Sequence, residues 1–167
     1  MKVAMIVAPQ NFRDEELLKP KEVLESEGFS VEIFSKRAGK AKGMLGAAVE
    51  AKSYEDIKTE NFEAVVFVGG AGASSFFSDK KAHEIAISAW KSGKVLAAIC
   101  IAPSILANAG ILKGKKVTCY PSEAANLRQK GAAYTGKDVE TDGKIVTANG
   151  PTAAERFGKE IARLLKR

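Results

Sequence analysis

The sequence predicts an α/β fold, because short apolar segments alternate with segments of helical periodicity along its length. Segment 64–68 is a continuous apolar run, and so is segment 2–8 after its first residue, Lys2. Such runs are typical of strands covered on both faces of a parallel sheet. The strand expected at 30–35 follows a helical segment with almost no linker, as in a βαβ unit. We therefore expect one domain over residues 1–167, a three-layer αβα sandwich of flavodoxin-like type with a mostly parallel central sheet.

The first part of the chain predicts a strand, a loop and a helix in that order. Pro9 ends the strand at 2–8, and residues 10–14 are expected to form a loop. A helix is predicted over 15–27, where apolar residues recur at helical spacing and Gly28 follows the last turn. Pro20 should kink this helix or mark an irregular first turn.

After the second strand at 30–35, a stretch rich in Gly, Ala and Lys predicts a small hairpin over 39–52, and 56–62 is expected to be a connector. The next strand, 64–68, leads directly into Gly69-Gly70-Ala71-Gly72 at the expected carboxyl edge of the sheet, where ligands of open α/β sheets bind. The spacing matches neither the dinucleotide fingerprint nor a phosphate-binding loop, so no nucleotide cofactor is expected.

A helix predicted over 79–92 carries the only histidine, His83, near its start. Its buried face should contain Ile85, Ala86, Ala89 and Trp90, and Gly93 closes it. No second candidate ligand accompanies His83 at metal spacing, so we interpret it as a surface or capping residue and expect no metal site.

The stretch around Cys100 is the centre of the functional hypothesis. The apolar run 94–99 stops at Cys100, helical spacing begins immediately over 101–109, and Gly110 follows. This is the layout of a nucleophile elbow. A helix N-terminus favours a thiolate, so we expect a depressed pKa at Cys100 and none at Cys119. A buried structural cysteine is the alternative.

The last third of the chain continues the alternation of strands and helices. Tyr120-Pro121 is expected to form a turn, and Thr152 should cap a final amphipathic helix. The remaining expected elements are a strand at 116–119, a helix at 122–129, and, after Tyr134, a strand at 139–141, a turn at Asp142-Gly143 and a strand at 144–147.

Composition limits the classes of partner. The formal charge is +6, but lysines and arginines are scattered among acidic residues, and the densest cluster is Lys113, Lys115 and Lys116. Without aromatic interleaving or a binding motif, nucleic-acid binding is not expected. No secretory leader or membrane-spanning run is recognised, and two cysteines, Cys100 and Cys119, are expected to stay thiols in the cytoplasm.

Four sequence features together resemble the ThiJ/PfpI superfamily, which contains the parkinsonism-linked protein deglycase and archaeal intracellular proteases. They are Ala97-Ala98-Ile99-Cys100-x-Ala102-Pro103, Gly69-Gly70 after a buried strand, Glu16 four residues before Pro20, and the segment from Gly143 to Gly150-Pro151 before the last helix. The resemblance covers nearly the whole chain.

The resemblance implies that Cys100 is a catalytic nucleophile and that the carboxyl of Glu16 hydrogen-bonds its sulfur. It also implies an oxyanion hole formed by the backbone N–H groups of Gly70 and Ile101. From the residues alone, an exposed carboxylate near a helix N-terminus is the favoured interpretation of Glu16. Tyr120 is either a phenolic hydrogen-bond donor to substrate or a packed core tyrosine.

Two departures from the family pattern bear on the chemistry. Protease-like members have a histidine directly after the cysteine, where this chain has Ile101, and deglycase-like members have a histidine where this chain has Tyr120. A Cys–His mechanism would need His83 or a partner subunit to supply the ring, so amide hydrolysis is disfavoured and a Cys–Glu site remains.

The leading hypothesis is a cofactor-independent, Cys-dependent enzyme of the glyoxalase or deglycase type, acting on methylglyoxal-like dicarbonyls or their protein adducts. The alternatives are an oxidation-sensing stress protein or holdase chaperone that uses Cys100, and a PfpI-type intracellular cysteine peptidase. A homodimer or higher homo-oligomer is expected from the resemblance.

Overall fold

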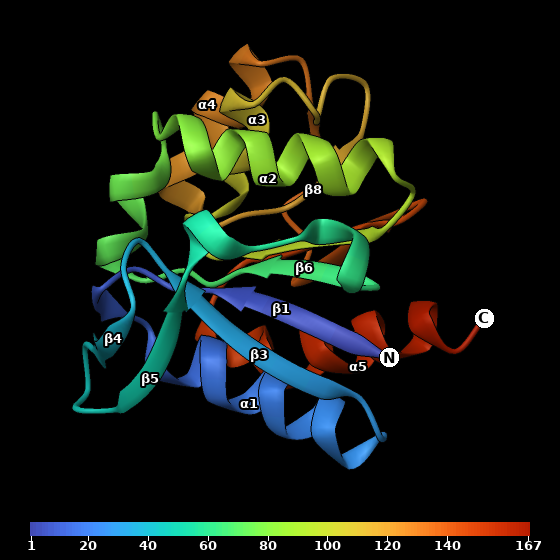
Figure 1. Cartoon of the computed structure of the whole chain (residues 1–167). Coiled ribbons are helices and arrows are strands. Elements are labelled where there is room, and N and C mark those ends of the chain that lie inside the picture. The colour runs from blue at the N-terminus through green and yellow to red at the C-terminus, as the bar shows by residue number, and fades with distance from the viewer.

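The computed structural model describes all 167 residues and has the predicted layered α/β architecture (Figure 1). Five parallel strands form the centre of the sheet in the order β11-β7-β6-β1-β3. They are β1 (Lys2–Ile6), β3 (Ser30–Ser35), β6 (Ala64–Phe67), β7 (Val95–Ile99) and β11 (Ile145–Ala148). This is the flavodoxin-like order, in which the winding direction reverses at β1.

Both predicted hairpins lie at the edges of this sheet. β10 (Val139–Asp142) pairs antiparallel with β11 at one edge. At the other edge β5 (Ala48–Ser53) pairs with β3 and with β4 (Gly39–Gly43), which confirms the hairpin expected over 39–52. The expected loop at 10–14 is wrong, since β2 (Gln10–Phe12) pairs in parallel with β4. So short a strand has no apolar pattern of its own and depends on the hairpin beside it.

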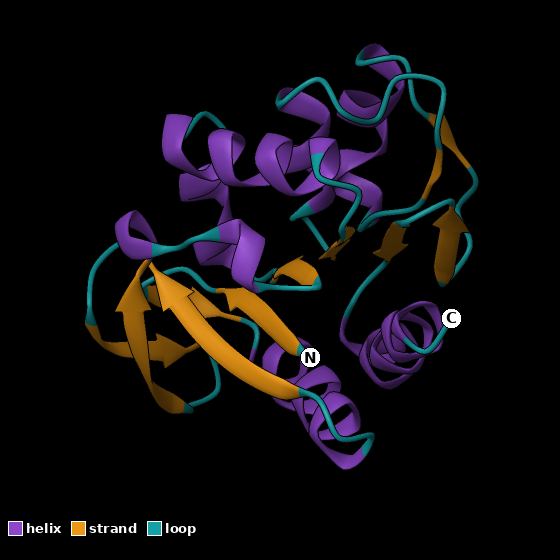
Figure 2. Cartoon of the chain, turned by 45° about the vertical axis from the view of Figure 1, so that its right-hand side comes forward, coloured by secondary structure: helices purple, strands orange, loops and turns teal.

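Helices cover both faces of the sheet (Figure 2). α1 (Asp14–Ser26) and α5 (Ala154–Leu165) pack together on one face, and the other face carries α2 (Lys80–Lys91), α3 (Pro103–Asn108) and α4 (Ala124–Gln129). Successive side chains of β1 alternate between the two cores, so that Val3 and Met5 pack toward α1 and α5 while Ala4 and Ile6 pack toward α2.

Two expectations about helix ends are corrected. α1 begins at Asp14 and runs uninterrupted through Pro20, which is buried against α5. A Cβ at Gly158 would lie 2.8 Å from Cα of Pro20, so the absence of a side chain there lets the two helices approach closely. Thr152 does not cap α5, because a 3-10 turn over Pro151–Ala153 precedes the helix and Ala153 takes the N-cap position.

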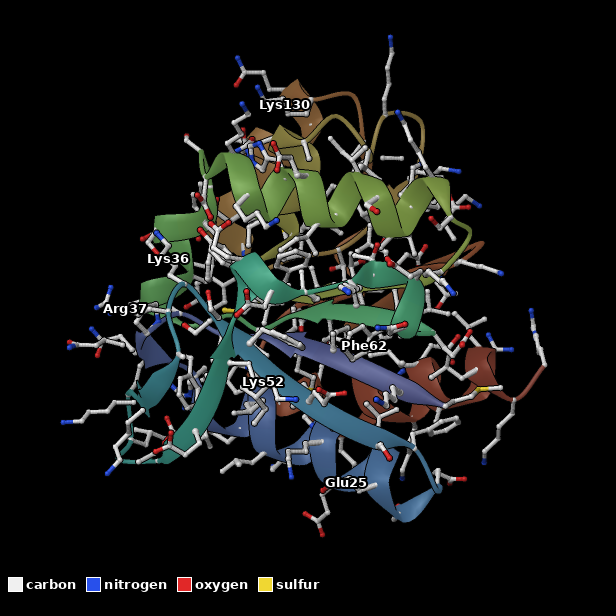
Figure 3. All side chains as sticks on the ribbon, in the orientation of Figure 1. Glu25, Lys36, Arg37, Lys52, Phe62 and Lys130 are labelled. Atoms are coloured by element: carbon white, nitrogen blue, oxygen red, sulfur yellow. The ribbon has the colours of Figure 1, made fainter.

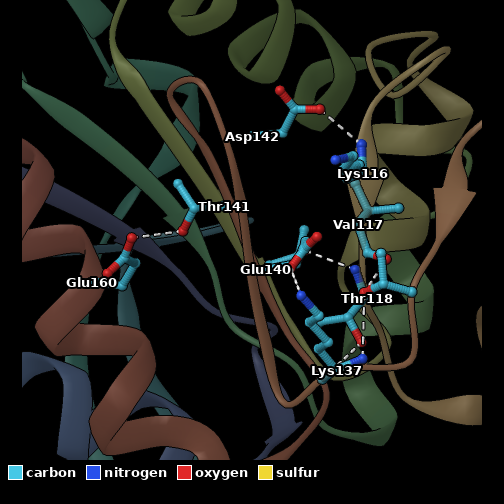
Figure 4. Close-up of polar contacts among 10 residues, drawn as sticks. Lys116, Val117, Thr118, Lys137, Glu140, Thr141, Asp142 and Glu160 are labelled. Carbon is cyan, nitrogen blue, oxygen red and sulfur yellow. Dashed lines mark hydrogen bonds and ion pairs between the residues drawn. The ribbon is translucent and has the colours of Figure 1, made fainter.

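The segment after α3 lies outside the main sheet. β8 (Lys116–Val117) is shorter than the expected strand and pairs only with β9 (Ala133–Tyr134). Side chains attach it to the β10–β11 edge (Figure 4), with Lys116 N donating to Oδ2 of Asp142 at 2.8 Å and Thr118 N donating to Oγ1 of Thr147 at 2.9 Å. The position of Cys119, the next residue, therefore depends on side-chain contacts.

Short 3-10 turns complete the connections, at Tyr54–Asp56, Thr59–Asn61, Ala71–Phe76 and Pro121–Glu123. No helix of this protein combines the length and the apolar character that crossing a membrane requires.

Candidate active site

Cys100 lies in a sharp turn between β7 and α3, as the elbow pattern predicts. Its φ is +66°, and only one other non-glycine residue, Asn11, has a positive φ. The turn is fixed at both ends, because Cys100 N donates to Ala148 O at 2.9 Å and Tyr120 N donates to Cys100 O at 2.8 Å. A left-handed conformation is unfavourable for a residue with a Cβ, so these contacts hold Cys100 in a strained position.

Glu16, in the first turn of α1, is fully buried beside Cys100. A Cβ at Gly69 would lie 2.4 Å from Oε1 of Glu16 and 2.6 Å from Cβ of Cys100, so the two side chains meet where Gly69 leaves room. Neither carboxyl oxygen has a hydrogen-bond partner of good geometry. A buried carboxylate without partners is unfavourable, and this geometry therefore favours the protonated carboxyl.

The titration of Glu16 agrees with that environment. Burial raises the pKa of Glu16 to about 7, although the neighbouring Cys100, Arg13 and backbone N–H of Gly69 act to lower it. Below neutral pH the carboxyl keeps its proton and can donate it toward the sulfur of Cys100.

The expected depression of the Cys100 pKa is wrong. Burial, followed by the negative charge of Glu16, raises the pKa of the Cys100 thiol to about 12, against the lowering effect of the Gly70 and Ile101 N–H groups. The thiol is only 8% exposed, and α3 begins three residues later and is short, so the helix terminus cannot offset burial. When Glu16 is protonated its opposing charge disappears, so the state of the carboxyl controls how readily the thiolate forms.

Cys119 differs from Cys100 in its neighbouring groups and in the hydrophobic core to which it belongs. It is fully buried in the core under α2, α3 and α4, whereas Cys100 belongs to the core under α1 and α5. Burial and then the charge of Glu123 raise its pKa to about 12 as well, with Arg128 opposing. No backbone N–H group lowers the pKa of Cys119, so the two cysteines differ in their donors.

The structure brings four of the expected site residues together: Cys100, Glu16, Gly70 and Ile101. Gly70 has a φ of +102°, and a Cβ there would lie 2.3 Å from Arg13 N, so only glycine fits. The imidazole of His83 lies elsewhere, with Nε2 2.9 Å from Phe77 O, and no histidine is among the groups that shift the pKa of Cys100.

Tyr120 is close to the site through its backbone, whose N–H bonds Cys100 O, but its side chain is 47% exposed. The packed core tyrosine considered for this position is therefore wrong. Its ring borders Gly150, where a Cβ would lie 3.8 Å from Cδ1 of Tyr120.

Sequence reasoning gave no role in the site to two residues that shape it, Gly69 and Asp14. The buried Asp14 carboxylate accepts hydrogen bonds from the backbone N–H groups of Leu45 and Ala47, both at 2.8 Å. Burial acts to raise the pKa of Asp14, but these bonds hold it below its usual value. Asp14 therefore ties the β4–β5 turn to the start of α1, two residues before Glu16. A carboxylate at a helix start is too common a signal to reveal this contact.

Comparison with known proteins gives consistent matches over the whole chain. The DJ-1/PfpI family matches residues 1–164. A deglycase of Pyrococcus horikoshii is 33% identical over 99% of this chain and 100% of its own length, and a protein of Bacillus subtilis provisionally named a cysteine protease is 33% identical over 99% and 98%. The crystal structure of a ThiJ/PfpI domain protein from Brachyspira murdochii superimposes with a TM-score of 0.97 at 32% identity, covering 99% of this chain and 96% of that one.

Proposed function

The chain belongs to the DJ-1/PfpI family, and from this premise we propose that it is a cysteine-dependent enzyme of the glyoxalase or deglycase type that needs no cofactor. Its substrates are methylglyoxal-like dicarbonyls or the adducts that they form with proteins. One observation carries the proposal: a buried carboxyl that titrates near neutrality stands beside a thiol that two backbone N–H groups also face. The deglycase names of relatives support the same class of reaction.

In the first step the Cys100 thiol releases its proton to water, and the resulting thiolate attacks the aldehyde carbon of the dicarbonyl. A C–S bond forms, and the electron pair of the carbonyl π bond moves to oxygen. The N–H groups of Gly70 and Ile101 stabilise this oxyanion, and Glu16 transfers its proton to it, giving a neutral hemithioacetal.

Glu16, now a carboxylate, then removes the proton from the hydroxyl-bearing carbon and returns a proton to the adjacent carbon. The hydroxyl proton passes to the former ketone oxygen, and the hemithioacetal becomes the thioester of lactate. Water cleaves the thioester and restores the Cys100 thiol. The net reaction adds one water to methylglyoxal and yields lactate, so no oxidant or cofactor is consumed. A pKa near 7 suits Glu16 to both donating and accepting a proton at neutral pH.

A peptidase function of Cys100 has less support than the dicarbonyl reaction. Peptide hydrolysis by a cysteine nucleophile relies on a neighbouring base to activate the thiol and protonate the leaving amine. Ile101 follows the cysteine, and His83 is bonded to the Phe77 carbonyl. We therefore expect peptide hydrolysis near background.

A second candidate function, oxidation sensing, is favoured by the buried and unpartnered carboxyl of Glu16. Two equivalents of peroxide would oxidise the Cys100 thiol to a sulfinate and be reduced to water, and a protonated Glu16 would donate a hydrogen bond to the product. This function requires no turnover of aldehyde.

We propose, further, that the chain forms a homo-oligomer. Its support is a set of exposed apolar side chains around the Asp14 contact, namely Leu18, Met44 and Leu45, of which Leu45 is 64% exposed. Light scattering should give a mass above that of one chain, and Leu45→Glu should lower it.

The enzyme hypothesis is tested by measuring lactate from methylglyoxal with wild type, Cys100→Ala and the matched control Cys119→Ala. We expect turnover to fall at least about 10³-fold in Cys100→Ala and to stay within about threefold in Cys119→Ala. An inert wild type that gains the mass of two oxygens at Cys100 in peroxide would favour the sensor instead. Peptidase activity that Cys100→Ala abolishes would contradict the argument from the missing imidazole.

The role of the carboxyl is tested by Glu16→Gln and Glu16→Leu. Both should lose roughly 10²-fold or more in turnover, because neither transfers a proton. Only the glutamine retains a donor, so stable sulfinate should form more readily in Glu16→Gln than in Glu16→Leu. Equal behaviour in both assays would remove Glu16 from the site.

A further inference from the structure

A hollow of about 360 Å³ lies at the carboxyl edge of the sheet, where the connections after β1, β3 and β6 meet. The residues that line it include Pro9, Gln10, Lys36, Arg37, Ser74 and Ser75. β3 and β6 flank β1 on opposite sides, so the hollow stands at the point where the winding of the sheet reverses. Open α/β sheets bind ligands at this point.

The hollow is lined by basic residues and has no acidic residue in its lining. The three connections, residues 7–13, 36–47 and 68–78, contain no aspartate or glutamate. Lys36 and Arg37 line the hollow, and Lys40 lines a smaller one that adjoins it across Arg37. Folding thus brings three segments without acidic residues together and leaves a local excess of positive charge.

The two cations are presented differently (Figure 3). Lys36 is held in place, since its Nζ donates to Ser75 O at 3.0 Å and lies 5.2 Å from the centre of the Phe76 ring. Its ammonium group retains two further donors. Arg37 takes part in none of the ion pairs of the chain, so all the N–H groups of its guanidinium can donate to a ligand.

The uncharged groups around these cations are also suited to an anion. The hydroxyls of Ser74 and Ser75 border the hollow, together with the Gln10 side chain. Ser74 donates to Ala71 O at 3.0 Å, and nothing within the protein bonds the Ser75 hydroxyl. A planar guanidinium, a fixed ammonium and the free Ser75 hydroxyl form the donor set that recognises tetrahedral oxyanions.

We propose that this hollow binds the phosphate group of a small phosphate monoester. Arg37 contacts two phosphate oxygens through its fork, Lys36 supplies a fixed point charge, and Ser75 donates a hydroxyl hydrogen bond. The segment from Gly69 to Gly72 joins this site to Cys100, because Gly69 abuts Cys100 and Gly72 lines the hollow. Cys100 does not line the hollow, and the inference is independent of the reaction proposed for the cysteine.

The test is isothermal titration calorimetry with glycerol 3-phosphate at fixed ionic strength, with glycerol as the neutral control ligand. We expect saturable binding of one glycerol 3-phosphate per chain and none of glycerol. Arg37→Gln and Lys36→Met should each weaken binding about tenfold or more, since each removes a charge-assisted contact. Lys130→Gln, which removes the same charge from an exposed position at the end of α4, should leave affinity within about twofold.

Several outcomes would overturn the proposal. They are the absence of saturable binding, equal weakening by Lys130→Gln and Arg37→Gln, and inorganic phosphate binding at least as tightly as the monoester. Cys100→Ala should bind normally, so a failure of the enzyme hypothesis leaves this result intact and the reverse also holds. Thermal melting of each variant checks that the surface substitutions leave the fold unchanged.

Discussion

Cys100 and Cys119 are both buried thiols with raised pKa values, yet only one has the surroundings of a nucleophile. Cys100 sits in a strained turn that the main sheet fixes, with the Gly70 and Ile101 N–H groups and the Glu16 carboxyl nearby. Cys119 follows a two-residue strand outside that sheet and is surrounded by apolar side chains. Burial alone therefore does not distinguish the two cysteines, whereas the directed donors around Cys100 do.

After removal of the Cys100 thiol itself, the largest effect that would sharpen this comparison is expected from Gly69→Ala. The new Cβ would meet Glu16, Cys100 Cβ and the Ile99 carbonyl oxygen at 2.6 Å or less, so the reactive groups must shift. Dicarbonyl turnover should fall about 10²-fold, because misplacement of about 1 Å has that effect. Gly150→Ala is the matched control, since its Cβ would meet only Tyr120, at 3.8 Å. An equal loss of turnover in both variants would show that Gly69 has no specific role in the site.

The Glu16 carboxyl beside Cys100 should make stability depend on pH. Burial raises the Glu16 pKa from 4.5 to about 7, so between these values the unfolded chain releases a proton that the folded chain keeps. Stability should therefore fall as pH rises from about 4.5 to 7, by about 3 kcal/mol from this group. Urea unfolding should show this fall in wild type but not in Glu16→Gln. The fall should persist in Glu123→Gln, and its loss there would contradict the assignment.

The regions around Cys100 and Cys119 also differ in how carboxylates anchor their backbone. Asp14 is buried and accepts two backbone N–H groups, while Asp142 accepts one, from Lys116, nearer the surface. Asp14→Ala should destabilise the protein by about 2 kcal/mol, because it leaves two donors unpaired. Asp142→Ala should reduce stability by about 1 kcal/mol or less. Thermal melting gives both values, and a larger effect at Asp142 would reverse the comparison.

The smallest expected effect is on alkylation rates. Both thiols should react slowly with iodoacetamide at pH 7 and faster as pH rises, because their raised pKa values keep them protonated. Cys100 should still react roughly tenfold faster than Cys119, since its thiolate has donors and some exposure. Peptide mass spectrometry measures the ratio, and preferential labelling of Cys119 would contradict the elbow assignment.

Patterns of local origin were predictable from the sequence. The apolar runs, the hairpins and the strand-to-helix junction at Cys100 predicted the layered fold and the elbow, because periodicity and glycine positions report on short-range structure. The resemblance supplied Glu16, which the structure places beside Cys100. That pairing joins residues far apart in the chain, and spacing alone gives no sign of it.

What could not be predicted depends on tertiary contact. β2 exists because β4 lies beside it, and Ala153 begins α5 because a 3-10 turn precedes the helix. The depressed pKa expected at Cys100 failed because helix-terminus reasoning omits burial and the charge of Glu16. The hollow at Lys36 and Arg37 was likewise not predicted, because the sequence does not show that parts of the acid-free connections 7–13 and 68–78 fold beside these two residues.

The positive φ of Cys100 affects which residue should be selected at position 100 in a library of variants. Glycine adopts this conformation without the penalty of about 1 kcal/mol or more that a side chain incurs. In a library selected for folding alone, glycine should therefore become enriched at position 100. In a library selected for growth under aldehyde stress, cysteine should persist despite the strain. The frequency of glycine at this one position thus reports whether selection acts on the chemistry of the thiol or only on the integrity of the fold.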